Sequence, residues 1–329
     1  MKLASLKEGG RDGSLVVVSE DLRRAASATG IAANLQTALE NWSTTEEPLR
    51  QLFDAVQQGG ADGLVDVDLA DLASPLPRAY QFLDGSAYLV HVERVRRARG
   101  AEMPPSFLTD PLMYQAVSDG FHPPSGTIMV ESEDFGIDFE AEVCVVTGDV
   151  PMGVSADAAL SHVLLLCLVN DISLRNLIPA ELGKGFGFMH SKPRSALSPV
   201  AVTPDQLGDS WRDGKIHLPL TTHYNGELFG NPECGVDMQF DFGELIAHAA
   251  RTRPLSAGTI IGSGTIANKD ESRGSSCLAE RRMLEIIADG EARTPFMRFG
   301  DTVRVEMLDA GGASIFGAIE HMISRYDRS

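Results

Sequence analysis

The chain has 329 residues, of which 43% are hydrophobic and 22% charged, and it carries a formal net charge of −18 at pH 7. This composition is ordinary for a globular protein, and the length favours two domains of unequal size. Nucleic acid and anionic membranes are negatively charged, so the acidic balance argues against either as a partner. A small anionic substrate is not excluded, because local cations or a metal ion can reverse the field inside a pocket.

Residues 1–73 are expected to form a small α/β domain. The segment 14–18 has the apolar, β-branched character of a strand, whereas 21–28 and 37–59 carry apolar residues at helical spacing. Acidic and basic side chains are scattered through this region, as on a solvated surface, so we expect a scaffolding or dimerising role. Two prolines in the segment 74–78 then favour an extended linker.

Residues 78–329 are expected to form the larger domain. Short β-like segments alternate there with glycine and proline, at 127–130, 141–146, 164–170, 218–224, 259–261, 302–307 and 313–319. Helices are few, the clearest being 155–162, with Ser155 as its N-cap, and 242–252. The pattern predicts an α+β fold in which the larger domain is a β-rich roll or sandwich of mixed strands.

The four cysteines, Cys144, Cys167, Cys234 and Cys277, contain no Cys-x-x-Cys pair. Reduced, packed thiols in an intracellular protein explain them better than a disulfide framework or a zinc site. The N-terminus lacks the apolar segment of a signal peptide, and the longest apolar run, 163–169, is too short to cross a bilayer. We therefore expect a cytoplasmic protein without a membrane partner.

The stretch 138–146 carries two acidic residues on a predicted strand. Side chains alternate between the faces of a strand, so Glu140 and Glu142 point the same way, about 7 Å apart. Asp171 ends the next apolar run and supplies a third carboxylate. Such a cluster is costly unless a cation neutralises it, and oxygen ligands suit Mg²⁺, Ca²⁺ or Mn²⁺ better than zinc. An isolated Glu-x-Glu pair is more often the wet face of an amphipathic strand, so other residues must decide.

Further polar residues follow in a fixed order along the larger domain. They are Asp84, His91, Tyr114, Asn170-Asp171 with Arg175, Lys184, Lys192 ahead of Ser198-Pro199, Ser263-Gly264-Thr265, and Glu280. Each piece is weak alone, but the ordered set resembles the fumarylacetoacetate hydrolase family, which shares the metal-binding Glu-x-Glu, the Asn-Asp signature, a lysine segment leading to Ser-Pro and a Ser-Gly-Thr loop. The resemblance runs from about residue 78 to the C-terminus and implies that family's fold and a homodimer.

The resemblance also implies a metal site. Glu140, Glu142 and Asp171 match the family's metal-ligand carboxylates. Asp84 matches a fourth ligand, because it stands seven residues before the position of the catalytic histidine, although some smaller members of the family manage with three. The implied cofactor is Mg²⁺, with Ca²⁺ or Mn²⁺ as alternatives.

A base and a lysine are implied in the same way. His91 matches the general base, and Glu280 matches the glutamate that orients it. Lys192, shortly before Ser198-Pro199, matches the active-site lysine better than Lys184, which has the Gly-Lys dipeptide but lies farther from that pair.

Three more residues match groups that contact the substrate: Arg175 as a second cation near its oxygens, and Tyr114 and Thr265 as hydroxyls that hold it. Two positions depart from the pattern. Fumarylacetoacetases have a glutamine where this chain has Ile178, and Pro193 follows the lysine where small or aromatic residues are expected. Both changes lie beside the expected reacting centre, so the substrate and the reaction stay open.

Ordinary structural roles compete with several of these assignments. Asp171 could end a strand as a turn residue, and His91 could lie on a charged helical surface. Glu280 could form a surface ion pair with Arg281, and Tyr114 could be a core residue.

The first functional hypothesis is a metal-dependent hydrolase that cleaves a carbon-carbon bond in a β-diketo acid. The substrate would be fumarylacetoacetate, giving fumarate and acetoacetate, or a related acylpyruvate, in tyrosine degradation or other aromatic catabolism. His91 would take a proton from water, and Lys192 and Arg175 would stabilise the oxyanion. Within the same fold, an oxo-acid decarboxylase or isomerase would not need His91 to activate water. A third hypothesis is a non-catalytic dimeric scaffold with a vestigial acidic site.

Overall fold

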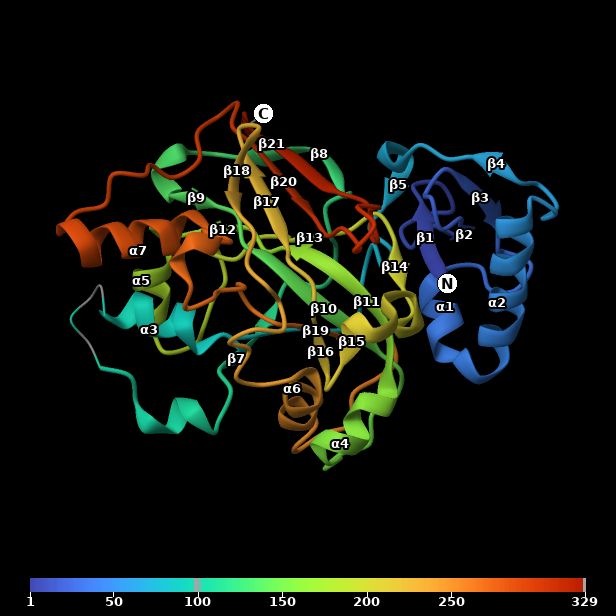
Figure 1. The fold of residues 1–329 in the computed structure, drawn as a ribbon, viewed down its shortest axis with the longest axis horizontal. Helices are drawn as coiled ribbons and strands as arrows, with labels where there is room; N and C mark the ends of the chain where they lie inside the picture. The colour runs from blue at the N-terminus through green and yellow to red at the C-terminus, as the bar shows by residue number, and fades with distance from the viewer. Residues whose placement is uncertain (98–99, 101, 328–329) are drawn as a thin grey trace.

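Most strands of the computed structural model, which describes residues 1–97, 100 and 102–327, belong to two sheets (Figure 1). The larger sheet has this order: β4 (Val65–Asp66), β3 (Arg24–Ser27), β2 (Ser14–Val18), β1 (Lys2–Leu6), β14 (Ala201–Val202), β11 (Val163–Asn170), β10 (Ala141–Thr147), β19 (Ile260–Gly262), β6 (Phe82–Gly85) and β7 (Met113–Ala116). In addition, β13 (Ala196–Leu197) pairs with β11, and β5 (Leu72–Ala73) with β1. The N-terminal strands thus continue the same hydrogen-bonded sheet as the strands that follow residue 78.

The smaller sheet has the order β18 (Glu227–Gly230), β17 (Thr221–Tyr224), β20 (Thr302–Glu306), β21 (Ile319–Arg325) and β8 (Ser125–Val130). Its strand β21 runs parallel to β8 and antiparallel to β20. Two short pairs stand apart: β9 (Ile137–Asp138) with β12 (Ser173–Leu174), and β15 (Trp211–Arg212) with β16 (Lys215–Ile216).

Helices lie around the larger sheet, with α1 and α2 at the N-terminal end and α3, α5 and α7 at the opposite end (Figure 1). Their bounds are α1 (Leu35–Glu40), α2 (Trp42–Gln58), α3 (Leu89–Arg97), α4 (Ala156–Ala159), α5 (Ile178–Leu182), α6 (Phe242–Ala249) and α7 (Leu278–Asp289). Short 3₁₀ turns are η1 (Leu69–Asp71), η2 (Pro105–Leu108), η3 (Glu133–Phe135), η4 (Leu160–His162), η5 (Pro204–Ser210) and η6 (Glu271–Arg273). Within the described ranges, no helix is both long and apolar enough to span a bilayer.

Two hydrophobic cores flank the central strands, because successive side chains of a strand point to opposite faces. Val143 and Val145 of β10 belong to the core that also contains side chains of β8, β20 and β21, so it fills the space between the sheets. Cys144 and Val146 belong to the other core, which α1 and α2 cover. Coverage on both faces explains why β10 and β11 are almost continuously apolar. The fold is therefore the mixed α+β, sandwich-like arrangement that the sequence predicts.

Several local predictions are confirmed. The strand expected at 14–18 is β2, and the Ser155 side chain accepts a hydrogen bond from the Ala158 N–H as the N-cap of α4. All four cysteines are free and buried. The helix expected at 37–59 is present, but it is divided at Asn41 into α1 and α2.

The predicted helix at 21–28 is wrong. Arg24–Ser27 forms β3, which pairs antiparallel with β2 so that Val17 lies opposite Ala26. Leu22, with a φ of 62°, lies in the turn between the two strands. The alanines of this segment fit the periodicity of a helix and that of a strand equally well. The segment forms a strand because it pairs with the edge of β2 that would otherwise lack a partner strand.

The strand expected at 313–319 is also wrong in position, because β21 begins only at Ile319. Gly317 has a φ of 73°, and a Cβ at that position would lie 2.8 Å from Pro199. The chain therefore turns sharply past Pro199 before it joins β8 and β20.

A buried histidine in β21 predicts a pH-dependent stability. His321 is buried, its Nε2 lies 2.9 Å from the Pro123 carbonyl, and burial lowers its pKa to about 4. An unfolded histidine has a pKa near 6.5, so the unfolded chain binds a proton first as the pH falls. We expect His321 to contribute a loss of about 3 kcal/mol in the free energy of unfolding between pH 6.5 and 4.

Denaturant titrations at several pH values measure this contribution as the difference between the wild type and His321→Gln, whose curve is expected to be flatter in that window. His190→Gln is the control, because His190 is exposed. Equal pH slopes for wild type and His321→Gln would contradict the prediction.

Candidate active site

Four carboxylates converge where neighbouring strands of the larger sheet end. Asp84, Glu140, Glu142 and Asp171 each offer an oxygen, and these oxygens all lie within 4.8 Å of one another. The Asp171 N–H donates to the Glu140 carbonyl at 3.0 Å, which fixes the end of β11 beside the start of β10. Asp84 comes from β6, where it lies opposite Gly262 of β19.

These carboxylates are not the wet face of a strand, because the exposed fraction of each of the four residues is 5% or less. Within the described part of the chain, neither carboxylate oxygen of Glu142 has a hydrogen-bond partner. A buried carboxylate without partners is strongly disfavoured in the ionised state. The donor set therefore fits a hard divalent cation, which supplies the missing partner.

The pKa values set Asp84 and Glu142 apart from Glu140. Burial and the nearby carboxylates raise the pKa of Asp84 to about 8 and that of Glu142 well above its usual range. Burial also opposes ionisation of Glu140, but Arg175 and Lys192 outweigh it and hold the pKa of Glu140 well below its ordinary value. Asp84 and Glu142 are thus the positions at which a metal ion would displace protons.

Lys192 is the lysine that the structure brings to the cluster. Its Nζ lies 2.5 Å from Asp171 Oδ2 and 3.1 Å from Glu140 Oε2, and the side chain is buried. Burial favours the neutral amine, but the two carboxylates prevail and raise the pKa of Lys192. Lys184, the other candidate, is exposed in the segment after α5.

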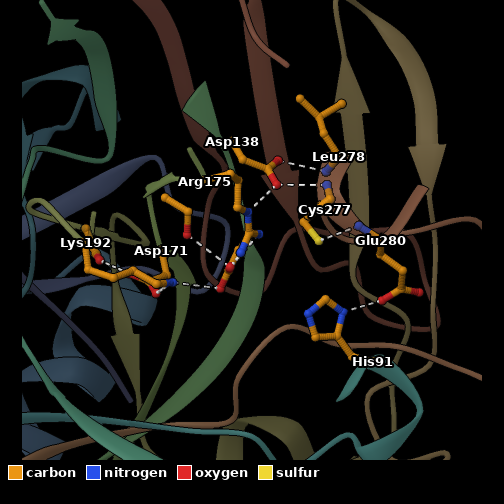
Figure 2. Close-up of polar contacts among 12 residues, drawn as sticks. His91, Asp138, Asp171, Arg175, Lys192, Cys277, Leu278 and Glu280 are labelled. Carbon is orange, nitrogen blue, oxygen red and sulfur yellow. Dashed lines mark hydrogen bonds and ion pairs between the residues drawn. The ribbon is translucent and has the colours of Figure 1, made fainter. Parts of the chain in front are cut away.

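Arg175 lies on the same side of the site, held by two acidic residues. Its Nη2 lies 2.6 Å from Glu140 Oε1, and its Nε donates to Asp138 Oδ2 at 2.8 Å. The fully buried Asp138 also accepts hydrogen bonds from the N–H groups of Leu278 and Ala279, at 2.8 and 2.9 Å (Figure 2). One carboxylate thus links Arg175 to the first turn of α7.

A histidine–glutamate pair lies on the far side of Asp138. His91 Nδ1 is 2.7 Å from Glu280 Oε2 (Figure 2). Arg94 donates from Nη1 to Glu280 Oε1 at 2.6 Å. His91 and Arg94 come from α3, and Glu280, which is fully buried, from the first turn of α7. This contact orients the imidazole and leaves Nε2 for proton exchange.

One cavity of about 160 Å³ joins these groups. Its lining includes Asp84, His91, Tyr114, Glu140, Arg175, Lys192 and Thr265 among the predicted residues, together with Val92, Ile178 and Phe188. The Tyr114 hydroxyl donates to Asp171 Oδ2 at 2.7 Å, and burial raises the pKa of Tyr114 well above its ordinary value, so this hydroxyl is a neutral donor. All ten predicted site residues lie at the carboxylate cluster, the cavity or the His91 pair; their individual roles stay predictions.

Two glycines allow this close assembly. A Cβ on Gly262 would lie 2.3 Å from Asp84 Oδ1, so only glycine fits opposite Asp84. Gly264 has a φ of 75°, and its N–H donates to the same oxygen at 3.2 Å. The Ser-Gly-Thr motif is therefore a backbone support for Asp84 as well as the source of Thr265.

Four supporting residues were not predicted: Asp138, Arg94, Ser173 and Ser195. The hydroxyls of Ser173 and Ser195 donate to Glu140 and Asp171 respectively. Asp138 stands two residues before Glu140, so on a strand the two side chains would point to the same face, and this spacing could have predicted Asp138 as a site residue. Arg94 stands three residues after His91, one helical turn away, so the helical surface considered for this segment already placed the two side chains close together.

Residues 81–324 match the family model for the fumarylacetoacetate (FAA) hydrolase C-terminal domain, and residues 1–78 match the model for fumarylacetoacetase N-terminal domain 2. The chain therefore belongs to the fumarylacetoacetate hydrolase family.

Characterised relatives differ in the reactions they are named for. The 2,4-didehydro-3-deoxy-L-rhamnonate hydrolase of Sphingomonas sp. (strain SKA58) is 30% identical over 162 residues, which are 48% of this chain and 53% of that protein. The mitochondrial oxaloacetate tautomerase fahd2 of Xenopus laevis is 26% identical over 211 residues, 62% of this chain and 57% of that protein. The chain spans about half the length of these curated relatives.

Maleylpyruvate hydrolase from Sphingobium sp. SYK-6, whose crystal structure is a complex with manganese (II) ion and pyruvate, shares the fold. Its TM-score is 0.65 at 16% identity, and the alignment covers 99% of this chain and 100% of that one.

A metal titration tests the cluster directly. Because neither oxygen of Glu142 has a hydrogen-bond partner among the described residues, we expect Mg²⁺ or Mn²⁺ to raise the melting temperature of the wild type by several degrees. Ligand at ~100 times its Kd stabilises by about 2.7 kcal/mol. Burial raises the pKa of Glu142, so folding without metal must protonate this carboxylate, and Glu142→Gln removes that cost. The variant should therefore melt higher than the metal-free wild type but lose most of the metal-induced shift.

Differential scanning calorimetry with and without chelator measures both effects. Asp119→Asn is the matched control, because Asp119 is an exposed carboxylate outside the cluster. An unchanged metal-induced shift in Glu142→Gln would contradict this assignment.

Proposed function

We propose that this protein is a divalent-metal-dependent hydrolase that cleaves the carbon-carbon bond of a β-diketo acid, with an acylpyruvate as the closest substrate type and fumarylacetoacetate as a related one. The observation that carries the proposal is the His91–Glu280 pair, which faces the same small cavity as the carboxylate cluster. A base beside an oxygen-ligand metal site is what hydrolysis of a chelating oxo-acid requires.

Asp84, Glu140, Glu142 and Asp171 would hold the ion, with Mg²⁺ as the first candidate and Mn²⁺ or Ca²⁺ as alternatives. When bound, it would polarise the substrate carbonyl and stabilise negative charge on the neighbouring oxygens. Manganese in the Sphingobium hydrolase supports a metal of this class.

His91 has the geometry of a general base. Nε2 would take a proton from water, while Glu280 stabilises the resulting imidazolium and Arg94 holds the second oxygen of Glu280. Hydroxide would add to the acyl carbonyl carbon, the adjacent carbon-carbon bond would break, and the carbon released with the bonding pair would receive the proton from His91. A carboxylic acid and a ketone-containing acid result, so atoms and charge balance.

Two cationic side chains would assist the same hydrolytic step from the side of the cavity opposite His91. Lys192 and Arg175 place fixed positive charge beside the carboxylate cluster, where negative charge develops on substrate oxygens during attack. Tyr114 and Thr265 add hydroxyl groups to the lining, and we propose that they hold the substrate.

A second candidate is tautomerisation, isomerisation or decarboxylation of an oxo-acid. The tautomerase name of the Xenopus relative favours it, and such a reaction would use the metal site without a water-activating base. A non-catalytic scaffold would leave the contact between His91 and the buried Glu280 without a purpose, which argues against the third hypothesis.

The wider setting of the protein remains part of the proposal. We propose a cytoplasmic homodimer acting in tyrosine degradation or other aromatic catabolism. We also propose two domains, at 1–73 and 78–329, a division supported by the two family models, which meet between residues 78 and 81.

An oxo-acid panel tests the reaction. We expect Mg²⁺- or Mn²⁺-dependent hydrolysis of acylpyruvates or fumarylacetoacetate, which chelator abolishes, and a fall in kcat of about 100-fold or more in His91→Ala because the base is lost. Oxaloacetate tautomerisation and decarboxylation are assayed in parallel.

His190→Ala is the control for this experiment, because His190 is exposed in a nearby segment. Near-unchanged hydrolysis in His91→Ala would reject the hydrolytic mechanism. Activity confined to oxaloacetate would favour the second candidate.

A further inference from the structure

The cavity beside the carboxylate cluster is lined by two kinds of side chain. The polar members Glu140 and Lys192 are buried, whereas Val92, Ile178 and Phe188 are only partly buried. His91, Tyr114 and Arg175 are partly buried as well, so the apolar group lines the outer part of the cavity beside these polar side chains, and we call Val92, Ile178 and Phe188 the outer wall. A substrate whose oxo-acid end lies at the carboxylates therefore extends its acyl end along that wall.

The basic side chains that line the cavity already have acidic partners. Arg175 contacts Asp138 as well as a cluster carboxylate, Lys192 bridges two cluster carboxylates, and His91 contacts Glu280. Lys184 follows α5 but does not line the cavity. A second substrate carboxylate at the outer wall would thus lose water without gaining a cation, which is costly.

The wall is held in place by specific contacts. The ring of Phe188 packs edge-on against Tyr114, with centroids 4.9 Å apart at 83°. The Glu181 carboxylate at the end of α5 accepts hydrogen bonds from the N–H groups of Met189, His190 and Ser191. The segment that carries Phe188 is therefore anchored immediately after it, and the wall is a fixed surface.

The space is also small. Its volume of about 160 Å³ lies below the roughly 300–1,000 Å³ that is usual for small-molecule sites. This favours a short acyl group over a long one.

From these observations we infer that the substrate is a monocarboxylic β-diketo acid with a short, uncharged acyl end, and that Ile178 and Phe188 select it. The inference rests on the proposed function for its substrate class and adds the chemistry of the acyl end. Dicarboxylic substrates, whose far end is an anion, are disfavoured by the same wall.

A matched substrate pair tests the selection. Butanoylpyruvate and succinylpyruvate differ in a terminal methyl or carboxylate, and we expect kcat/KM for the first to be about 100-fold higher because the second buries an unpaired charge. Ile178→Arg places a cation in the wall and should reduce that ratio at least about tenfold, mainly by raising kcat/KM for succinylpyruvate. Leu182→Arg is the control, since Leu182 lies on the same helix, is exposed and does not line the cavity.

A binding measurement separates this inference from the proposed reaction. Calorimetry with Mg²⁺ compares 2-oxopentanoate with 2-oxoglutarate, which again differ in a terminal methyl or carboxylate, and needs no turnover. Tighter binding of 2-oxopentanoate without hydrolysis of any acylpyruvate would support the wall's selectivity and reject the hydrolase. Equal kcat/KM or equal affinity within either pair, or a preference for its dicarboxylic member, would overturn the inference whatever the reaction is. The wild-type protein alone gives this comparison, so the test stands even if Ile178→Arg fails to fold.

Discussion

Charge balance among four buried carboxylates is the constraint on which the rest of the site depends. Lys192 bridges two of them, Glu140 and Asp171, and thereby supplies positive charge to that half of the cluster. Asp84 and Glu142 have raised pKa values, so protons or a metal ion must complete their half. Metal binding is then coupled to proton release, and affinity for the ion should rise with pH until both groups are ionised.

The carboxylate cluster and the His91–Glu280 pair share one anchor. Asp138 binds Arg175 on the side of the carboxylate cluster and the first N–H groups of α7 on the side of the base. A carboxylate at a helix N-terminus is favoured by the helix dipole and satisfies donors that have no partner within the helix. Since Glu280 lies in that same first turn, the position of the His91 pair relative to the metal cluster is set through Asp138. The distance between His91 and the carboxylate cluster is thus a property of buried backbone rather than of surface loops.

The sequence predicts the parts of this arrangement that follow from residues close together in the chain, and it misses the parts that follow from contacts between distant ones. The common orientation of Glu140 and Glu142 follows from strand periodicity, and the resemblance to a family supplied Asp84 and His91 from their spacing. The strand β3 could not be predicted in the same way, because its short alanine-rich segment is decided by pairing with β2. The start of α7 was missed for a related reason: its N-cap is Cys277, an unusual capping residue, and its further acceptor comes from a strand about 140 positions away. Interactions of that kind leave no local pattern.

The carboxylate cluster and the outer wall of the cavity are built from different kinds of structure. The residues proposed to carry the reaction are therefore separate from those proposed to select the substrate. The carboxylates lie at the ends of buried strands, where a change such as a Cβ on Gly262 would collide with a ligand. Ile178 and Phe188 lie on a short helix and the segment that follows it, partly exposed, where a new side chain alters contacts with the substrate but not the charge balance of the cluster. A fold of this kind can keep one metal centre while its wall accepts different acyl groups. Relatives named for a hydrolase and for a tautomerase can therefore share the sheet that builds the centre, and the substrate of each member must be argued from its own wall residues.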